Sequence, residues 1–449
     1  MSAFALDAHA YDTSQPSGSF WHAADGIEAP GLVGATTADV AIIGGGVVGL
    51  NAALRLVESA GVDVVLLEAG EIGWGASGRN GGFCSDGATK LAPRAMRRRF
   101  GAVEAQRFFD LQLGAIDHVA HLLERLGIDA GPKKGEGEML LAHRPLAHTD
   151  LASECQAIEA AYGRKVTLFD TDGLSGFGMA GPQFHSGVLI PIGFALDPGR
   201  YVRALARAVL SQGARLCARS RVVAIDQAGA GFRLRTKGGE VTAKRLIVAT
   251  NAYTDEALVP ALRGRLLPAF SNVLVTRPLT DAELADQGWT SSCMAFDSRE
   301  LLHYFRLLPD RRFLFGGRGG VDGGPGGQAQ AQARLRRDFH VLFPAWREVE
   351  VRHLWSGLVC LTRDLLPFVG QLDAPKGAWT ALGWHGNGVA MGSKAGELVA
   401  DLALGSLRLA DLPAPLTQKL RRFPLPRSLL LRAAYAWFDY RDGPLKADP

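Results

Sequence analysis

The sequence has few cysteines and no long apolar run. Its five cysteines stand far apart and include no CxxC pair, which indicates neither a disulfide framework nor a metal site. No window offers the roughly eighteen consecutive apolar residues of a membrane span. The first residues lack the basic and apolar regions of a secretory signal. We therefore expect a cytoplasmic protein in a reducing environment, with no metal ion.

Charge is also modest, with a net value of +4 for 449 residues. The basic residues are scattered, and the arginines at 97–99 lie in a mixed stretch typical of a solvated helix face, so we expect no nucleic-acid partner. The amphipathic tail at 427–442 is expected to pack on its own protein rather than on a membrane surface. The length and the 47% hydrophobic content are typical of a folded protein with two domains.

The strongest motif is a glycine-rich turn in ADVAIIGGGVVGLNAALRLVESAGVDVVLLEAG. An apolar strand enters Gly44, Gly46 and Gly49, a helix follows, and a second apolar strand ends at Glu68. The glycines permit a tight turn, the approach of a pyrophosphate and close packing of helix on strand. The helix N-terminus attracts phosphate, and the carboxylate accepts hydrogen bonds from ribose hydroxyls. The pattern predicts a dinucleotide site and leaves NAD and FAD both open.

Two further glycine-rich stretches bear on that choice. GWGASGRNGG at 73–82 directly follows the second strand, and GWHGNGVAMG at 383–392 opens a helix near the other end of the chain. Glycines let the main chain approach a ligand closely. One NAD site does not explain two such loop-to-helix units, whereas one long cofactor lying between them does. Strand patterns over 268–320 predict a second, antiparallel sheet, unlike the regular alternation of a simple dehydrogenase.

Hydrophobic periodicity predicts several other elements. We expect helices at 92–125, 197–213 and 328–343, a strand at 137–143, and a pair of strands around the KGGE turn at 237–240.

Together these motifs resemble the D-amino acid oxidase superfamily of flavoproteins, in its branch of glycine, sarcosine and γ-glutamylputrescine oxidase-like enzymes. The matching stretches include VAIIGGGVVGLNAALRL, EAGEIGWGASGRNGG, LIVATNAYT, LLHYFRLLPD, WSGLVCLTRDLLPFVG and GWHGNGVAMGSKAGELVADL. The resemblance implies an α/β fold, with a Rossmann-like FAD-binding domain and an interleaved α+β substrate domain built on an antiparallel sheet. It places the FAD domain at 1–95, 185–255 and 355–425, the substrate domain at 96–184 and 256–354, and a helical extension at 426–449.

The resemblance also implies which residues bind FAD. The first glycine turn holds the ADP half, Val222 touches adenine through its backbone, and the loop at 383–392 cradles the flavin ring. The complete set is Gly44, Gly46, Val48, Gly49, Glu68, Ala69, Ser77, Arg79, Asn80, Gly81, Gly82, Val222, Ala249, Thr250, Gly357, Gly386, Asn387, Gly388 and Val389. Gly357 stands where sarcosine oxidases carry a cysteine bonded to FAD, so we expect non-covalent FAD. Leu314 stands where they carry a lysine that promotes the reaction with oxygen, which leaves fast oxidase behaviour open.

The implied reaction oxidises a C–N bond of a small amine or amino acid substrate. Hydride passes to flavin N5, water hydrolyses the imine, and O2 or another acceptor reoxidises the flavin, O2 giving H2O2. Arg306 is the candidate for binding an anionic substrate group, although a structural ion pair is an equal alternative. His303 and Tyr304 alternate along one strand, so one of them should face the site. His385, beside the flavin loop, is either a polar contact or a satisfied loop histidine.

Three other functions remain open from the sequence. An amine dehydrogenase with a non-oxygen acceptor agrees with Leu314. A flavin-binding subunit or sensor without turnover would share the cofactor motifs. An NAD-dependent dehydrogenase is disfavoured by the second glycine loop.

Overall fold

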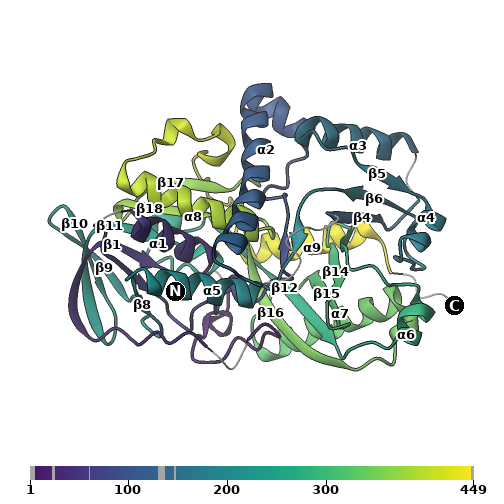
Figure 1. Cartoon of the computed structure of the whole chain (residues 1–449), viewed down its shortest axis with the longest axis horizontal. Helices are drawn as coiled ribbons and strands as arrows, with labels where there is room; N and C mark the ends of the chain where they lie inside the picture. The colour runs from purple at the N-terminus through teal and green to yellow at the C-terminus, as the bar shows by residue number, and fades with distance from the viewer. Residues whose placement is uncertain (1–5, 23–25, 60, 130–136, 146–147, 446–449) are drawn as a thin grey trace.

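The described residues form two large β-sheets that lie side by side, with helices packed on them (Figure 1). The structure is a computed structural model and describes residues 6–22, 26–59, 61–129, 137–145 and 148–445. Each large sheet has eight strands among these residues, and a short third sheet pairs β3 (Phe83–Cys84) with β7 (Phe194–Ala195). This architecture confirms the predicted α/β class with a Rossmann-like domain and a mainly antiparallel second sheet.

The first sheet has the strand order β17-β18-β11-β1-β2-β8, and its strands from β18 to β8 are parallel. Val40 and Ile42 of β1 are buried on one face, and Ala41 and Ile43 on the other, which explains the apolar run in the sequence. The strands are β1 (Gly34–Ile43), β2 (Val64–Leu67), β8 (Arg215–Cys217), β9 (Ala224–Ala228), β10 (Gly231–Arg235), β11 (Gly239–Val248), β17 (Phe368–Asp373) and β18 (Lys376–Leu382).

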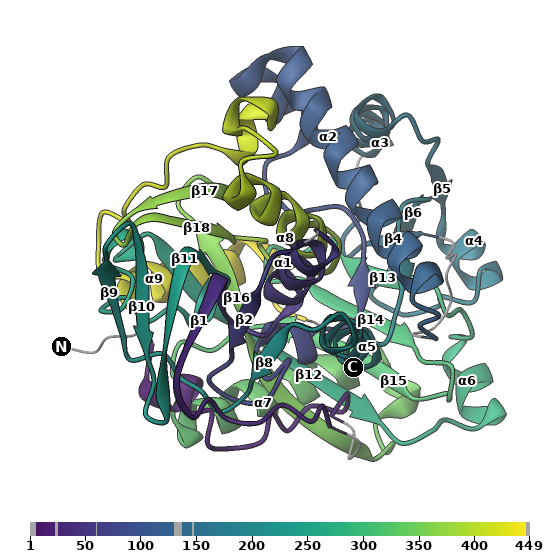
Figure 2. The ribbon, with the colours of Figure 1, turned by 60° about the vertical axis from the view of Figure 1, so that its left-hand side comes forward.

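Three helices cover one face of this sheet: α1 (Val47–Glu58), α5 (Pro198–Ser211) and α8 (Val389–Leu404) (Figure 2). The predicted strands around the KGGE turn are β10 and β11, which pair antiparallel. Because β1 and β18 both run parallel to β11, their carboxyl ends lie at one edge of the sheet. The two glycine-rich turns that open α1 and α8 therefore meet at this edge.

The second sheet has the order β16-β12-β15-β14-β13-β4-β6-β5, antiparallel throughout except for the β13–β4 pair. It contains the sheet predicted over 268–320 and extends it with strands from earlier and later in the chain. Its strands are β4 (Glu138–Ala142), β5 (Thr167–Phe169), β6 (Ser186–Ile190), β12 (Leu266–Thr276), β13 (Met294–Asp297), β14 (His303–Leu307), β15 (Phe313–Arg318) and β16 (Val351–Thr362).

An aromatic core fills one face of the second sheet. Phe305 and Phe315 of the strands pack with Phe339 of α7, and Trp289 and Trp346 close the same cluster. The opposite face carries Tyr304 and Leu314 in a separate, smaller cluster. The remaining helices are α2 (Pro93–Arg125), α3 (His148–Tyr162), α4 (Thr171–Gly176), α6 (Asp281–Gln287), α7 (Pro325–Leu342) and α9 (Arg427–Asp442).

The C-terminal helix α9 packs against the second sheet and neighbouring segments of the chain. Leu431 is buried in a small cluster with the second sheet, and Arg427 forms an ion pair with Glu256. At the helix end, Asp442 accepts hydrogen bonds from the Glu300 and Leu301 N–H groups at 2.9 and 3.0 Å. Within the described ranges, no helix combines the length and apolar character needed to cross a membrane.

The division of the chain into domains stays a proposal. Strand pairing favours one adjustment to it, because β6, which follows the proposed boundary at 185, and β16, which crosses the proposed boundary at 355, both belong to the second sheet. Both strands would then join the substrate domain.

Candidate active site

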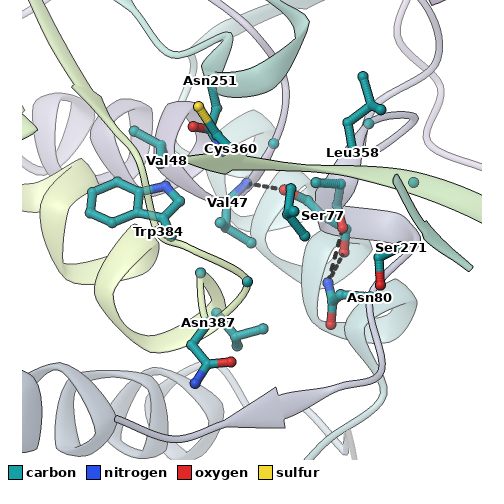
Figure 3. Close-up of a pocket in the computed structure, with 18 of the residues that line it drawn as sticks. Val47, Val48, Ser77, Asn80, Asn251, Ser271, Leu358, Cys360, Trp384 and Asn387 are labelled. Carbon is teal, nitrogen blue, oxygen red and sulfur yellow. Dashed lines mark hydrogen bonds between the residues drawn. The ribbon is translucent and has the colours of Figure 1, made fainter. Parts of the chain in front are cut away.

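A cavity of about 450 Å³ runs from the carboxyl edge of the first sheet to the second sheet. Ile43 and Leu67, at the ends of β1 and β2, line one part, and Tyr304 of β14 lines another. Figure 3 shows Trp384 and Asn387 of the second glycine loop facing Ser77 and Asn80 across this space. The cavity therefore joins all three glycine-rich stretches.

At the dinucleotide end, the main chain positions Glu68. Its carboxylate accepts hydrogen bonds from the Gly45 N–H at 2.7 Å and the Gly70 N–H at 2.8 Å. Burial raises the pKa of this carboxyl, and the two N–H groups act in the opposite sense. Gly44 has a φ of +112°, and a Cβ there would lie 2.7 Å from the Ala249 carbonyl oxygen. The turn therefore requires glycine.

The loop at 73–82 is braced by its own polar side chains. Ser77 Oγ accepts a hydrogen bond from the Val47 N–H at 2.9 Å, at the start of α1 (Figure 3). Asn80 Nδ2 donates to two carbonyls within the loop at 3.1 and 2.9 Å, and its Oδ1 accepts from the Gly82 N–H at 2.8 Å. Asn80 lines the cavity, but the hydrogen bonds of its side-chain amide are made to main-chain groups of the loop itself.

Arg79 is the loop residue with an unused donor. Its Nε donates to the Trp74 carbonyl at 2.7 Å, its Nη1 to the Ser356 carbonyl at 2.9 Å, and its guanidinium lies 4.2 Å from the centre of the Trp74 ring. Its Nη2 is buried without a hydrogen-bond partner. Burial lowers the pKa of this guanidinium. A buried charged donor without an acceptor is costly, so this atom indicates an acceptor supplied by a ligand.

The loop at 383–389 forms the opposite wall. His385 and Gly386 have positive φ values of 52° and 108°. Asn387 Nδ2 donates a hydrogen bond to the Asp86 carbonyl at 2.7 Å. This bond connects the loop at 383–389 to the segment that follows the loop at 73–82. The N-terminus of α8 follows at Val389, which also lines the cavity. Its free N–H groups favour negative charge there.

The structure brings together the residues predicted to bind the cofactor. All of them line the cavity except Gly49 and Gly82. A Cβ on Gly49 would lie 1.9 Å from the Gly44 carbonyl oxygen, so this glycine allows helix and strand to pack closely. Gly82 has a φ of +75°, and a Cβ there would lie 2.0 Å from the Leu196 carbonyl oxygen. Both glycines lie just outside the cavity lining and allow the close main-chain packing that supports it.

Of the four candidate catalytic residues, Tyr304 lines the cavity. Its hydroxyl lies 2.9 Å from Ser271 Oγ. His303 points to the opposite face of β14, where its Nδ1 lies 2.7 Å from Asp297 and its ring stacks on Phe315. Burial opposes a charge on His303, but Asp297 and Asp338 outweigh it and raise its pKa to about 9. Because successive side chains of a strand point to opposite faces, Tyr304 faces the cavity and His303 faces the aromatic core.

Arg306 does not line the cavity, although it was the leading candidate for the substrate. Its Nε donates to the Gly81 carbonyl at 3.0 Å and its Nη2 to the Leu196 carbonyl at 2.7 Å, and its guanidinium lies 5.7 Å from the Trp21 ring centre. Burial lowers its pKa to about 10. Main-chain carbonyls therefore occupy Nε and Nη2, and the side chain neither lines the cavity nor forms an ion pair among the described residues, so the structure places this arginine in a main-chain bracing role.

His385 also lies behind the wall. Its Nδ1 is 3.0 Å from the Ala88 carbonyl, and its Nε2 is 3.3 Å from the backbone nitrogen and from Oγ1 of Thr362. Burial lowers its pKa to about 3, so the ring is neutral at ordinary pH. This environment agrees with the alternative in which the ring nitrogens of His385 find their hydrogen-bond partners within the protein and not on a substrate.

Several further cavity residues come from outside the glycine-rich stretches. Arg318, at the end of β15, lines the cavity and donates from Nη2 to the His385 carbonyl at 3.0 Å. A charged set from separate elements lies nearby, consisting of Asp86, Lys90, Glu138 and Glu154. Only the folded chain places these side chains together. Among the described residues, no group of three or more His, Cys, Asp or Glu side chains could hold a metal ion.

Fold and cavity together are typical of an oxidoreductase with a dinucleotide site between its two large sheets. The model of one family, described as FAD dependent oxidoreductase (DAO), matches residues 39–402. The chain belongs to this family.

Individual relatives agree with this assignment. The chain is 32% identical over 416 residues to a probable oxidoreductase, OrdL, of Rhizobium meliloti, covering 92% of this chain and 94% of the relative. It is 29% identical over 411 residues to the γ-glutamylputrescine oxidoreductase of Escherichia coli, covering 90% and 93%. The crystal structure of glycine oxidase from Geobacillus kaustophilus superposes with a TM-score of 0.69 at 24% identity, covering 86% of this chain and 99% of that structure. The last comparison supports the fold alone.

The cavity residues fit FAD. Glu68 offers an acceptor at the ribose position, and the open N-terminus of α1 lies beside Gly46. The unpartnered Nη2 of Arg79 lies farther along the same wall and suits an acceptor on the pyrophosphate or the flavin. The loop at 383–389 closes the other side. The structure thus agrees with a long cofactor that spans both glycine turns.

Proposed function

We propose that this chain oxidises a C–N bond of a small amine or amino acid with non-covalently bound FAD. The observation that carries the proposal is the continuity of one cavity, from Glu68 at the dinucleotide end to Tyr304 and Phe296 of the second sheet. A reacting carbon bound there would lie in the same enclosure as the cofactor. The amine-directed names of the γ-glutamylputrescine oxidoreductase and glycine oxidase relatives support the same reaction class.

When bound, FAD supplies the acceptor for hydride. The chain has to orient the carbon, exclude water and accept the amine in its deprotonated form. Tyr304 and Trp384 provide aromatic wall on two sides of the cavity. Because His303 and His385 both lie outside it, we assign neither as a base. This agrees with a reaction in which a neutral amine needs no side chain to remove its proton.

Arg318 replaces Arg306 in our proposal as the arginine that acts within the cavity. Its hydrogen bond to the His385 carbonyl holds the guanidinium beside the loop at 383–389. A fixed positive charge there stabilises negative charge on a substrate carboxylate or on the reduced cofactor.

Non-covalent attachment has two supports. Gly357 lines the cavity and offers no thiol, and a Cβ there would lie 3.2 Å from Arg79 Cβ. Cys360 also lines the cavity, but burial raises the pKa of its thiol to about 12, and a protonated thiol is a poor nucleophile. Acid precipitation should therefore leave the yellow cofactor in solution, whereas a yellow pellet would overturn this part of the proposal.

A second candidate is an amine dehydrogenase with an acceptor other than oxygen. It is favoured by Leu314, which is buried in an apolar cluster and provides no charge near the cofactor. The two candidates share the reductive half-reaction and differ in what reoxidises the cofactor.

One experiment tests the reaction class. Purified holoprotein is mixed anaerobically with a library of amines and amino acids, flavin bleaching is followed near 450 nm, and the reduced protein is then mixed with oxygen. Bleaching followed by fast recolouring supports an oxidase, and slow recolouring supports a dehydrogenase. A yellow protein that no amine bleaches would favour the flavin-binding subunit or sensor, and a colourless protein would refute the proposal.

A further inference from the structure

The part of the cavity near the second sheet and helices α2 and α3 contains charged side chains that the proposed reaction does not use. Aromatic rings line the same region. The charged residues are Asp86, Lys90, Glu138 and Glu154, and the aromatic residues are Phe109, Tyr162, Phe296 and Tyr304. Acids and aromatic rings together are the chemistry that recognises an ammonium group.

Glu138 is a buried acid in this region whose carboxylate lacks a cationic partner among the described residues. It begins β4, lines the cavity and is only 6% exposed. Among the ion pairs of the described residues, none joins its carboxylate to a cation within 4.0 Å, and a hydrogen bond from Ser85 is its polar contact. Burial and the nearby Asp86 raise its pKa to about 8. A cation in the cavity would stabilise this carboxylate as an anion.

Asp86 is held rigidly beside it. Gln112 Oε1 accepts hydrogen bonds from the N–H groups of Gly87 and Ala88, both at 3.1 Å, and Asn387 donates to the Asp86 carbonyl at 2.7 Å. The Asp86 carboxylate accepts a hydrogen bond from the Tyr162 hydroxyl, and burial raises its pKa. Its position is thus fixed before any ligand arrives, and the Asn387 contact places it next to the cofactor loop.

The acids of this region have no close cationic partner. Two cations, Lys90 and Arg318, line the same cavity, and no ion pair within 4.0 Å joins either of them to Asp86 or Glu138 in the described chain. Glu154 adds a further acid at the exposed edge. With both acids ionised, their two negative charges match those of Lys90 and Arg318 in number, but neither acid has a cation within 4.0 Å, so a cationic ligand that lies directly against Glu138 is favoured electrostatically.

We propose that Glu138, assisted by Asp86, binds a second ammonium group of the substrate, so that diamines, polyamines and derivatives that keep a second positive charge are preferred over amines with one. This inference rests on the proposed amine oxidation and names the substrate class of that same site. The oxidised amine lies at the cofactor, and the second cation lies between the acid pair and the aromatic rings. Lys90 opposes the second cation and so limits the preference.

The test compares straight-chain α,ω-diamines of three to eight carbons with monoamines of the same length, using anaerobic flavin bleaching by the holoprotein. We expect the best diamine to exceed its monoamine in kcat/KM by about ten-fold or more, the range expected for one hydrogen-bonded charge pair. Glu138→Gln should bring this ratio close to one, and Lys90→Met should raise it. Glu348→Gln, which removes an exposed acid far from the cavity lining, is the matched control and should keep the wild-type ratio.

Thermal midpoints measured with and without each diamine separate this inference from the proposed function. The wild type, but not Glu138→Gln, should be stabilised by diamines and not by monoamines. This result without bleaching by any amine would refute the proposed oxidation and keep the ammonium site. Bleaching with equal ratios in the wild type and Glu138→Gln would keep the oxidation and refute the ammonium site. If Glu138→Gln retains no FAD, Asp86→Asn and Lys90→Met decide, because they must shift the ratio in opposite directions.

Discussion

Replacing Arg306 by methionine should weaken the fold rather than change substrate choice. The substitution removes charged donors from the Gly81 and Leu196 carbonyls, at 3.0 and 2.7 Å. A hydrogen bond to a charged group contributes about 1.5–3 kcal/mol. Removing a buried guanidinium also recovers part of its desolvation cost, so we expect a net loss of about 2–4 kcal/mol. Because Gly81 lines the cavity, FAD should bind less tightly as well.

The assay follows the release of flavin fluorescence on heating, together with KM values for amines that do and do not bear a carboxylate. The midpoint should fall by on the order of 5 °C, while the ratio of the two KM values stays constant. Arg352→Met, which removes a half-exposed arginine paired with Glu350, should melt like the wild type. An unchanged midpoint with a ten-fold rise in KM for the carboxylate-bearing amines alone would refute this reasoning and return Arg306 to the substrate site.

Three further predictions follow from individual contacts. His303, with its pKa raised from 6.5 to about 9 by its acidic partners, stabilises the fold fully below pH 6.5; this contribution is lost as the pH rises through 9, so the melting midpoint should fall between pH 7 and 10, and less so in His303→Phe. Arg79→Met should raise the FAD dissociation constant of apoprotein about ten-fold or more in a fluorescence titration, and an unchanged constant would show that Nη2 meets no cofactor atom. Gly82→Ala should prevent recovery of holoprotein, because its Cβ would lie 2.0 Å from a carbonyl oxygen; Gly229→Ala, also at positive φ but with open space around it, should cost only about 1 kcal/mol in denaturant titration.

Local sequence patterns predicted the dinucleotide end of the site well, because its requirements are local. A strand, a glycine turn and a helix within one short stretch dictate where Gly44 and Gly46 lie, and the following strand carries Glu68 to the same edge. The second glycine loop was also recognisable from sequence. Its meeting with the first depends only on β1 and β18 lying parallel in one sheet.

The substrate side depends on long-range pairing and was harder to predict. Strand alternation correctly separates Tyr304 from His303, but it cannot say whether Arg306 reaches substrate or main chain. That outcome depends on Leu196, which a distant segment brings to the guanidinium. Glu138 likewise enters the cavity because β4 pairs parallel with β13, a contact between segments far apart in the sequence.

The bonds that hold Asp86 explain how one scaffold can change its substrate while keeping its cofactor. The segment 86–88 is fixed through its own main-chain groups, which contact the side chains of Gln112 and Asn387. A different side chain at position 86 would leave those bonds in place, so the charge facing the substrate can change without moving the cofactor loop. Glu138 has the same freedom, because its strand is held by main-chain pairing with β6 and β13. The glycine turns have no such freedom, since added atoms at Gly44 would collide with the main chain itself. We therefore expect substitutions in the acid pair to alter substrate choice, and substitutions in the turns to abolish cofactor binding.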